Sequence, residues 1–337
     1  MPCYKPLEAF QYLTPKPNGK AEIIFKRPID RPYKEIELPC GQCIGCRILR
    51  TISWAMRIQH EIDVPAKDKD GNNIVEQYKN CFITLTYDDK HLPQDHSLYH
   101  EHFQKFLKRF RKAIYPKKIR FFMCGEYGDD TWRPHYHAII FGYDFTEGIK
   151  YKGNWHNRRQ RIQESEVGNP YYISSFLKEL WGMSKNYPII AEANFDTAAY
   201  VARYCTKKIT GEKADEHYNR QIIDWNEYTG EVLEMFETQL LPEYSSSSKK
   251  PGIGKGWWEK YKTDTYSNYL INNGKKTPVP KYYDKLLEME DEVQLKAMKV
   301  ARQLALINKK EELTPERLKQ RHEVKKKQMK QLERKKI

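Results

Sequence analysis

The sequence lacks the long apolar runs that a membrane protein needs. No stretch approaches the ~18 consecutive apolar residues of a transmembrane helix, and the N-terminus does not show the basic-then-apolar pattern of a secretory signal. The seven cysteines are odd in number and unevenly spaced, which argues against a disulfide scaffold and for thiols or metal ligands. There is no helicase motif. We therefore expect an intracellular protein that has no membrane partner.

The chain carries a large excess of positive charge. Its 337 residues include 59 Lys and Arg against 45 Asp and Glu, for a formal net charge of +14. A polyanion is the natural partner of such a chain. Aromatic residues make up 13%, with 24 Tyr, and aromatic faces among Lys and Arg suit unstacked bases better than lipid headgroups. The composition therefore predicts a single-stranded nucleic acid as the partner.

A strand with two histidines is the first candidate site. Residues 133–142 are apolar and β-branched, which predicts a strand. Strand alternation then places His135 and His137 on one face, where two imidazoles can bind one metal ion. A preceding strand is predicted at residues 119–124, and a hairpin between the two would bring in Glu126 as a third ligand. The alternative is a sheet strand that merely carries two histidines.

A tyrosine pair is the second candidate. Residues 196–208 predict a helix capped by Asp196. Tyr200 and Tyr204 are spaced i, i+4 and share a face one turn apart, with Lys207 on the same side. Tyrosines at this spacing can also simply pack a core.

A cysteine cluster near the N-terminus is the third candidate. Cys40, Cys43 and Cys46 are separated by two residues each, the spacing of a metal knuckle. A tetrahedral site needs a fourth ligand, for which Cys3 is the best candidate and His60 the next. Reduced cysteines packed around a turn are the alternative to a zinc site.

Other periodic segments outline the remaining elements. Residues 315–337, after a cap at Thr314, hold ten Lys or Arg and three Glu, a net +7, which predicts a basic helical arm or, alternatively, a solvated helix without a partner. A hairpin is expected around Thr229. Further helices are expected at residues 47–62, 98–114, 171–181 and from 281, and further strands at 81–87 and 188–195.

The order of these segments resembles that of a known family. A strand with Thr84-Leu85-Thr86 is followed by Glu126, by His135-x-His137 and by Tyr200-x-x-x-Tyr204-x-x-Lys207. This order resembles the rolling-circle replication initiators of the HUH endonuclease superfamily, most closely those of gokushovirus-type microviruses, which are small single-stranded DNA phages. The resemblance extends over roughly residues 1–260, including the signature Cys40-Gly41-Gln42-Cys43-x-x-Cys46-Arg47 and the loop Pro251-Gly252-Ile253-Gly254. One departure is Tyr136 between the histidines, in place of a bulky aliphatic residue; its side chain is expected to face away from the metal.

The resemblance implies a mechanism. His135, His137 and Glu126 would ligate a divalent cation, Mg²⁺ or Mn²⁺, while Tyr200 and Tyr204 would be nucleophiles. Lys207 would be the associated catalytic lysine. The activity implied is the nicking of single-stranded origin DNA through a 5′-phosphotyrosine intermediate, followed by strand transfer that releases circular single-stranded DNA. A host polymerase and helicase would be partners, in the cytoplasm of a bacterial host cell.

Two other functions remain as alternatives. One is a relaxase or transposase of the same superfamily. The other is a non-catalytic, basic zinc-knuckle protein that binds nucleic acid.

The expected fold is α+β. An HUH-type central antiparallel sheet, ferredoxin-like or RRM-like, would have helices on one face. The metal would lie on the open face, with the tyrosine helix approaching it. An N-terminal Cys-rich segment and a helical, basic C-terminal arm would flank it. The expected division of the chain is residues 1–80 for the Cys-rich segment and a helix, 81–210 for the endonuclease core, 211–280 for a polar accessory segment and 281–337 for the arm.

Overall fold

The structure is a computed structural model, in which the chain folds into two compact units. Unit 1 comprises residues 1–50 and 285–337, and unit 2 comprises residues 51–284. The residues described are 3–17, 19, 21–129, 131–164, 168–204, 213–225, 229, 231–267, 269–272, 274–307 and 310–333.

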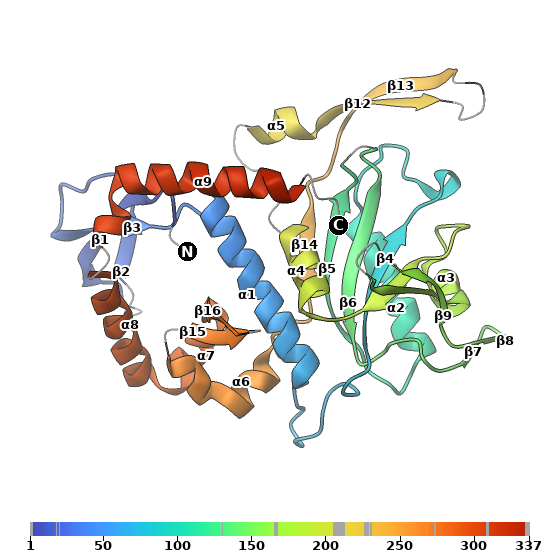
Figure 1. The fold of residues 1–337 in the computed structure, drawn as a ribbon, viewed down its shortest axis with the longest axis horizontal. Coiled ribbons are helices and arrows are strands. Elements are labelled where there is room, and N and C mark those ends of the chain that lie inside the picture. The colour runs from blue at the N-terminus through green and yellow to red at the C-terminus, as the bar shows by residue number, and fades with distance from the viewer. Residues whose placement is uncertain are drawn as a thin grey trace. The chain divides into compact units, whose positions relative to one another are not determined.

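Unit 2 is built around a central sheet (Figure 1). The described residues form seven strands in this sheet, and all neighbouring strands are antiparallel. In spatial order the strands are β14 (Tyr244–Ser247), β5 (Arg120–Tyr127), β6 (Pro134–Phe141), β4 (Asn80–Thr86), β11 (Ile189–Glu192), β10 (Pro170–Ile173) and β9 (Gln160–Glu164). The predicted α+β class with a central antiparallel sheet is therefore confirmed.

Helices cover both faces of this sheet. Helices α2 (His100–Ala113) and α3 (Ser175–Trp181) pack on one side, and α4 (Phe195–Tyr204) lies on the other (Figure 1). The second face also receives Ala55 and Ile58, from the part of α1 (Ile44–Asp63) that belongs to unit 2. The tyrosine helix α4 was expected on the face that carries the histidines, but the packing of α1 against that face was not; β6 is apolar toward both sides, and both apolar surfaces need cover.

The α2 face holds the larger core. Helix α2 contributes a buried stripe of four side chains, Phe103, Phe106, Leu107 and Phe110. Tyr136 points into this core, away from the two histidines, as predicted, and its hydroxyl donates to the carbonyl of Tyr99 at 2.8 Å. The other face is built on Phe122, Ile139 and Phe141.

The helix predicted at residues 171–181 was partly wrong. Strand β10 occupies its beginning, and α3 starts only after Ser174, whose hydroxyl accepts from the N–H of Leu177. The aromatic and β-branched sequence at 171–173 favours an extended chain.

Short elements extend unit 2. The hairpin predicted around Thr229 is present as β12 and β13. The remaining elements are β7 (Ile149–Tyr151), β8 (Asn154–His156), α5 (Lys213–Tyr218), β12 (Asn219–Trp225), β13 (Val232–Gln239), α6 (Lys255–Tyr261), β15 (Tyr269–Asn272), β16 (Lys275–Pro278) and the 3₁₀ turns Asp89–His91 and Lys262–Tyr266.

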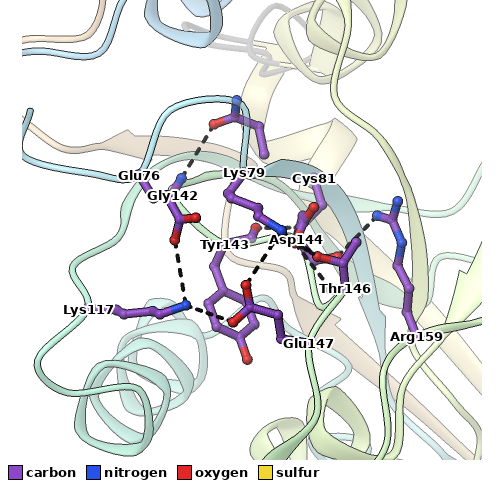
Figure 2. A network of polar contacts seen from close by, with 11 residues as sticks. Glu76, Lys79, Cys81, Lys117, Gly142, Tyr143, Asp144, Thr146, Glu147 and Arg159 are labelled. Atoms are coloured by element: carbon purple, nitrogen blue, oxygen red, sulfur yellow. Dashed lines mark hydrogen bonds and ion pairs between the residues drawn. The ribbon is translucent and has the colours of Figure 1, made fainter.

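A polar network fixes the chain where it leaves β6 (Figure 2). Lys117 pairs with Glu147 at 2.9 Å and with Glu76 at 3.5 Å, while Lys79 lies 3.6 Å from Glu147 and 3.8 Å from Asp144. Two cations face three carboxylates, so most of these charges are compensated within the network. The network lies at the end of the sheet where Asn80 pairs with Phe141.

Unit 1 joins the two ends of the sequence. Its sheet, which the sequence did not predict, has the order β2-β1-β3, with β1 (Leu7–Pro15), β2 (Ala21–Ile24) and β3 (Tyr33–Leu38). Its helical part contains the end of α7 (Lys281–Glu290), α8 (Glu292–Ile307), the 3₁₀ turn Lys310–Leu313 and α9 (Pro315–Glu333). The predicted cap of the last helix is confirmed, because the Thr314 hydroxyl accepts from the N–H of Arg317 at 3.4 Å. Among the described residues, no helix is both long enough and apolar enough to cross a membrane.

Candidate metal centre

The sheet register brings the two histidines and one carboxylate together. Glu126 pairs with His135 across β5 and β6, and His137 lies one alternation further along the same face. A single oxygen, Glu126 Oε1, lies 2.9 Å from Nε2 of His135 and 2.9 Å from Nε2 of His137. All three side chains offer ligand atoms within 4.8 Å of one another. The structure therefore gathers the three residues that the sequence proposed as one ligand set.

The hydrogen bonds of His135 orient its ring toward the Glu126 carboxylate. Nδ1 of His135 lies 3.1 Å from the carbonyl oxygen of Arg133. Because a carbonyl can only accept, Nδ1 of His135 donates its N–H there, and Nε2 is directed at Glu126 Oε1 at 2.9 Å. The donor set of two imidazoles and one carboxylate suits a divalent cation.

The pKa of Glu126 depends on burial and on its histidine partners. The carboxylate is buried, with 2% of its surface exposed. Burial alone would raise its pKa, but hydrogen bonds from His135 and His137 outweigh burial and lower the pKa below its usual value. The carboxylate is thus held in the charged form that a cation needs.

Two residues of β4 complete the surroundings of His137. Thr84 pairs with His137 across the sheet, and its hydroxyl lies 2.9 Å from Nδ1. Phe82 stacks on the His137 ring at a centroid distance of 5.5 Å. Sequence reasoning assigned neither residue a role at the site. Strand alternation does put Phe82 and Thr84 on one face, but the register against β6 cannot be obtained from one strand alone.

Helix α4 places a tyrosine beside the histidines. Ala198 and Val201 are fully buried in the core on this face and hold the helix against the sheet. The centroid of the Tyr200 ring lies 5.3 Å from that of the His137 ring and 6.0 Å from that of the Phe82 ring, and both ring pairs are edge-on. Tyr200 is 37% exposed, so the site opens to solvent on the tyrosine side.

The cap of α4 differs from the prediction. Asn194, not Asp196, caps the helix, because its side-chain oxygen accepts from the N–H of Thr197 at 2.9 Å. Tyr204 is the last residue of α4. Its side chain lies outside the described residues, as does the whole of Lys207.

The cysteines form a second group of possible ligands, within unit 1. Cys3, Cys40, Cys43 and Cys46 offer sulfur atoms that all lie within 4.8 Å of one another. Burial would raise the pKa of Cys43, but the N–H groups of Cys46 and Tyr4 donate to its sulfur and, with the neighbouring thiols, lower its pKa to about 6. His60, the other suggested ligand, lies elsewhere: its Nδ1 is 2.7 Å from the Tyr283 hydroxyl and its ring stacks on Trp257.

The central segment of the chain matches a known protein family. Residues 80–209, which contain the Glu126 and histidine site and the tyrosine helix, match the family described as replication-associated protein ORF2/G2P. The resemblance to the replication initiators of single-stranded DNA phages is thereby confirmed, and the chain is a relative of phage replication-associated proteins.

Individual relatives extend the match beyond this segment. The chain is 28% identical to replication-associated protein VP4 of Bdellovibrio phage phiMH2K, over 89% of this chain and 84% of that protein. It is also 28% identical to replication-associated protein ORF2 of Spiroplasma virus 4, over 79% of this chain and 73% of that protein. Identity to replication-associated protein ORF4 of Chlamydia phage 1 is 34%, over 51% of this chain and 38% of that protein. No solved structure matches the chain.

Proposed function

We propose that the protein is an HUH-type nicking enzyme that initiates rolling-circle replication. The observation that carries this proposal is the placement of the Tyr200 ring against His137, within the group whose histidines converge on one oxygen of Glu126. A nucleophile and a cation site are the two parts that phosphodiester transfer needs. A divalent cation bound there, Mg²⁺ or Mn²⁺, would withdraw negative charge from a nonbridging phosphate oxygen.

The residues of the chain perform the remaining tasks. Thr84 and the Arg133 carbonyl orient the two imidazoles, and burial of Glu126 keeps the ligand set rigid.

The Tyr200 oxygen attacks the phosphorus, a P–O bond forms, and the bond to the 3′ oxygen breaks. The DNA 5′ end becomes a phosphotyrosine, the leaving oxygen takes a proton to become a 3′-OH, and Lys207 would assist the ionisation of the tyrosine hydroxyl.

The second tyrosine suits a repeated cycle. The phosphotyrosine conserves the energy of the phosphodiester, so a 3′-OH can later reverse the reaction and join the ends. Tyr204 is one helical turn from Tyr200 and would cut the regenerated junction while the first strand is closed into a circle. In this scheme a host polymerase extends the 3′-OH and a host helicase separates the strands, in the cytoplasm of the bacterial host.

The test is covalent capture of DNA. The protein is incubated with single-stranded origin DNA, with and without Mn²⁺, and a denaturing gel is examined for a protein–DNA adduct. We expect an adduct that requires the cation and is absent when Tyr200 and Tyr204 are both changed to Phe. Tyr115→Phe, at a tyrosine that is 84% exposed, is the matched control and should form the adduct normally.

A histidine variant separates chemistry from binding. The double change His135→Ala and His137→Ala should abolish the adduct while the affinity for single-stranded DNA is kept, because phosphate contacts come from Lys and Arg. An adduct in the double tyrosine variant would place the nucleophile elsewhere. DNA binding by the unaltered protein with no adduct under any metal would favour the non-catalytic binder.

A further inference from the structure

The positive charge of the chain is concentrated in unit 1. Unit 1 holds 25 Lys or Arg and 14 Asp or Glu, a net charge of +11. Unit 2 holds 34 Lys or Arg and 31 Asp or Glu, a net charge of +3. The unit that contains the histidines and tyrosines is therefore nearly neutral, although it is more than twice as long. A positive charge excess attracts polyanions, so unit 1 is expected to attract a polyanion more strongly than unit 2 does.

The cysteine cluster has the dimensions of a single tetrahedral metal site. The Cys3 sulfur lies 3.5 Å from that of Cys40 and 3.8 Å from that of Cys43. A Zn–S bond of about 2.3 Å gives sulfur–sulfur edges of about 3.8 Å in a tetrahedron. A disulfide would instead bring two sulfurs to about 2.05 Å. The distances thus fit four thiolates around one ion.

Backbone N–H groups point at these sulfurs. Cys40 N–H donates to the Cys3 sulfur at 3.3 Å, Cys43 N–H to the Cys40 sulfur at 3.2 Å, and Tyr4 N–H to the Cys43 sulfur at 3.3 Å. Such donors stabilise negative charge on sulfur. Thiols packed only as small apolar groups would not need them.

Helix α9 is anchored on this cluster. Leu318 and Leu313 pack against the cysteines, and His322 stacks on Tyr4 with ring centroids 5.4 Å apart. Among the described residues this apolar cluster has three buried members, Tyr4, Cys43 and Leu318. A core this small stabilises little by itself, and small domains commonly use a metal instead.

The outer surface of α9 remains available for phosphates. Its exposed basic residues include Arg317, Lys319, Lys326 and Lys327. Arg317 and Lys326 each approach one glutamate of the same region, at 3.3 and 2.9 Å, and such exposed pairs contribute little. One side of α9 is therefore packed against the cysteine cluster, and the other side exposes basic residues.

We propose that Cys3, Cys40, Cys43 and Cys46 bind one structural Zn²⁺ that fixes α9, and that unit 1 so assembled binds the phosphate backbone of DNA. The choice of DNA as the polyanion rests on the proposed function. Unit 1 then supplies most of the electrostatic affinity, while unit 2 carries the chemistry.

The zinc site is tested by measuring the zinc content of the purified full-length protein. We expect about one zinc per chain by mass spectrometry, retained through dialysis and lost in Cys43→Ser. Cys81→Ser is the control, since Cys81 is a buried cysteine of unit 2 that donates to the Tyr143 carbonyl, and this variant should keep its zinc.

The DNA surface is tested with variants that leave the cysteines intact. In one variant Lys319, Lys326 and Lys327 are changed to Gln, and in its matched control the exposed Lys67, Lys69 and Lys112 of unit 2 are changed to Gln. Fluorescence anisotropy with a labelled single strand gives the affinity at several salt concentrations. Each lost contact lowers the log–log salt slope by about 0.7, so the α9 variant should lose about 2 and the control none.

Neither measurement depends on nicking, so failure of the proposed function would leave both results interpretable. A protein that contains no zinc, or equal salt slopes in the two lysine variants, would overturn the proposal.

Discussion

Thr84 orients the ring of His137 without touching the proposed cation. Its hydroxyl is the partner of Nδ1 at 2.9 Å, and such partners of a metal-binding histidine typically contribute about 10- to 100-fold in metal affinity. We predict that Thr84→Val raises the Mn²⁺ concentration for half-maximal nicking by about this factor, with the maximal rate changed much less. Thr84→Ser keeps the hydroxyl and should restore the normal metal dependence. Equal metal dependence in all three proteins would show that the contact is incidental.

The candidate site could be predicted from sequence only in part. The alternation of β6 put His135 and His137 on one face, and the short turn after β5 brought in Glu126, because both are local properties of the chain. The contribution of β4 could not be predicted, because Thr84 is 53 residues from His137 in sequence and no local rule fixes the register between β4 and β6. The identity of the helix cap was missed because Asn194 and Asp196 are both good capping residues, and only the backbone geometry decides between them.

His60 makes the stability of unit 2 depend on pH. Burial lowers its pKa to about 3, whereas in the unfolded chain it is about 6.5. As the pH falls below 6.5 the unfolded state takes up the proton first, so stability decreases by about 1.4 kcal/mol per pH unit until the folded-state pKa is reached.

The variant His60→Phe removes this titration and keeps a ring to stack on Trp257. Relative to the unaltered protein, it should gain about 2–3 kcal/mol between pH 7 and pH 4.5 in urea unfolding. A stability difference that is the same at both pH values would show that His60 is protonated equally in the two states.

At the scale of elements, a buried ion pair holds the loop before α6. Arg120 of β5 lies 2.6 Å from Glu61 of α1, and their side chains are 4% and 0% exposed. Arg120 also donates to the Pro251 carbonyl, and the other Glu61 oxygen accepts from the N–H of Gly254. Gly254 has a φ of 82°, and a Cβ there would lie 2.6 Å from the Tyr283 hydroxyl. The Pro251–Gly254 loop is thus a junction between helix and sheet.

Breaking this pair should be costly. Glu61→Gln leaves the Arg120 charge buried without compensation, which typically costs about 3–5 kcal/mol. Glu259→Gln, at an exposed pair with Lys255, should change stability by less than about 1 kcal/mol. Thermal unfolding of the two variants compares them directly, and similar melting temperatures would contradict the structural role.

The elements that were predicted correctly are those with strong local signals. The helix expected at residues 98–114 and the Thr314 cap of α9 each depend on residues within a few helical turns of one another. The sheet β1–β3 was missed because its strands mix charged and apolar residues, as in the exposed pattern of β3. The contribution of α1 to the second face of the central sheet was missed, because Ala55 and Ile58 lie far from β6 in sequence.

At the scale of the whole molecule, the two ends of the sequence meet in one unit. The N-terminal cysteines and the C-terminal helix α9 share an apolar cluster. Sequence analysis described them as separate segments, because nothing local relates residue 3 to residue 318. Because α9 packs against the cysteines, its basic residues are held on a folded unit.

The last strand of the central sheet has a consequence for the nascent chain. Strand β14 covers the outer side of β5, but residues 244–247 leave the ribosome more than a hundred residues after β5. Until then β5 is an open strand edge, which readily pairs with other chains. The segment that matches the replication family ends at residue 209, so a fragment cut there should self-associate by this edge, whereas one extended through residue 284 should be monomeric by size-exclusion chromatography. The central sheet of unit 2 is therefore completed late in translation, although Glu126, His135 and His137 are synthesised much earlier.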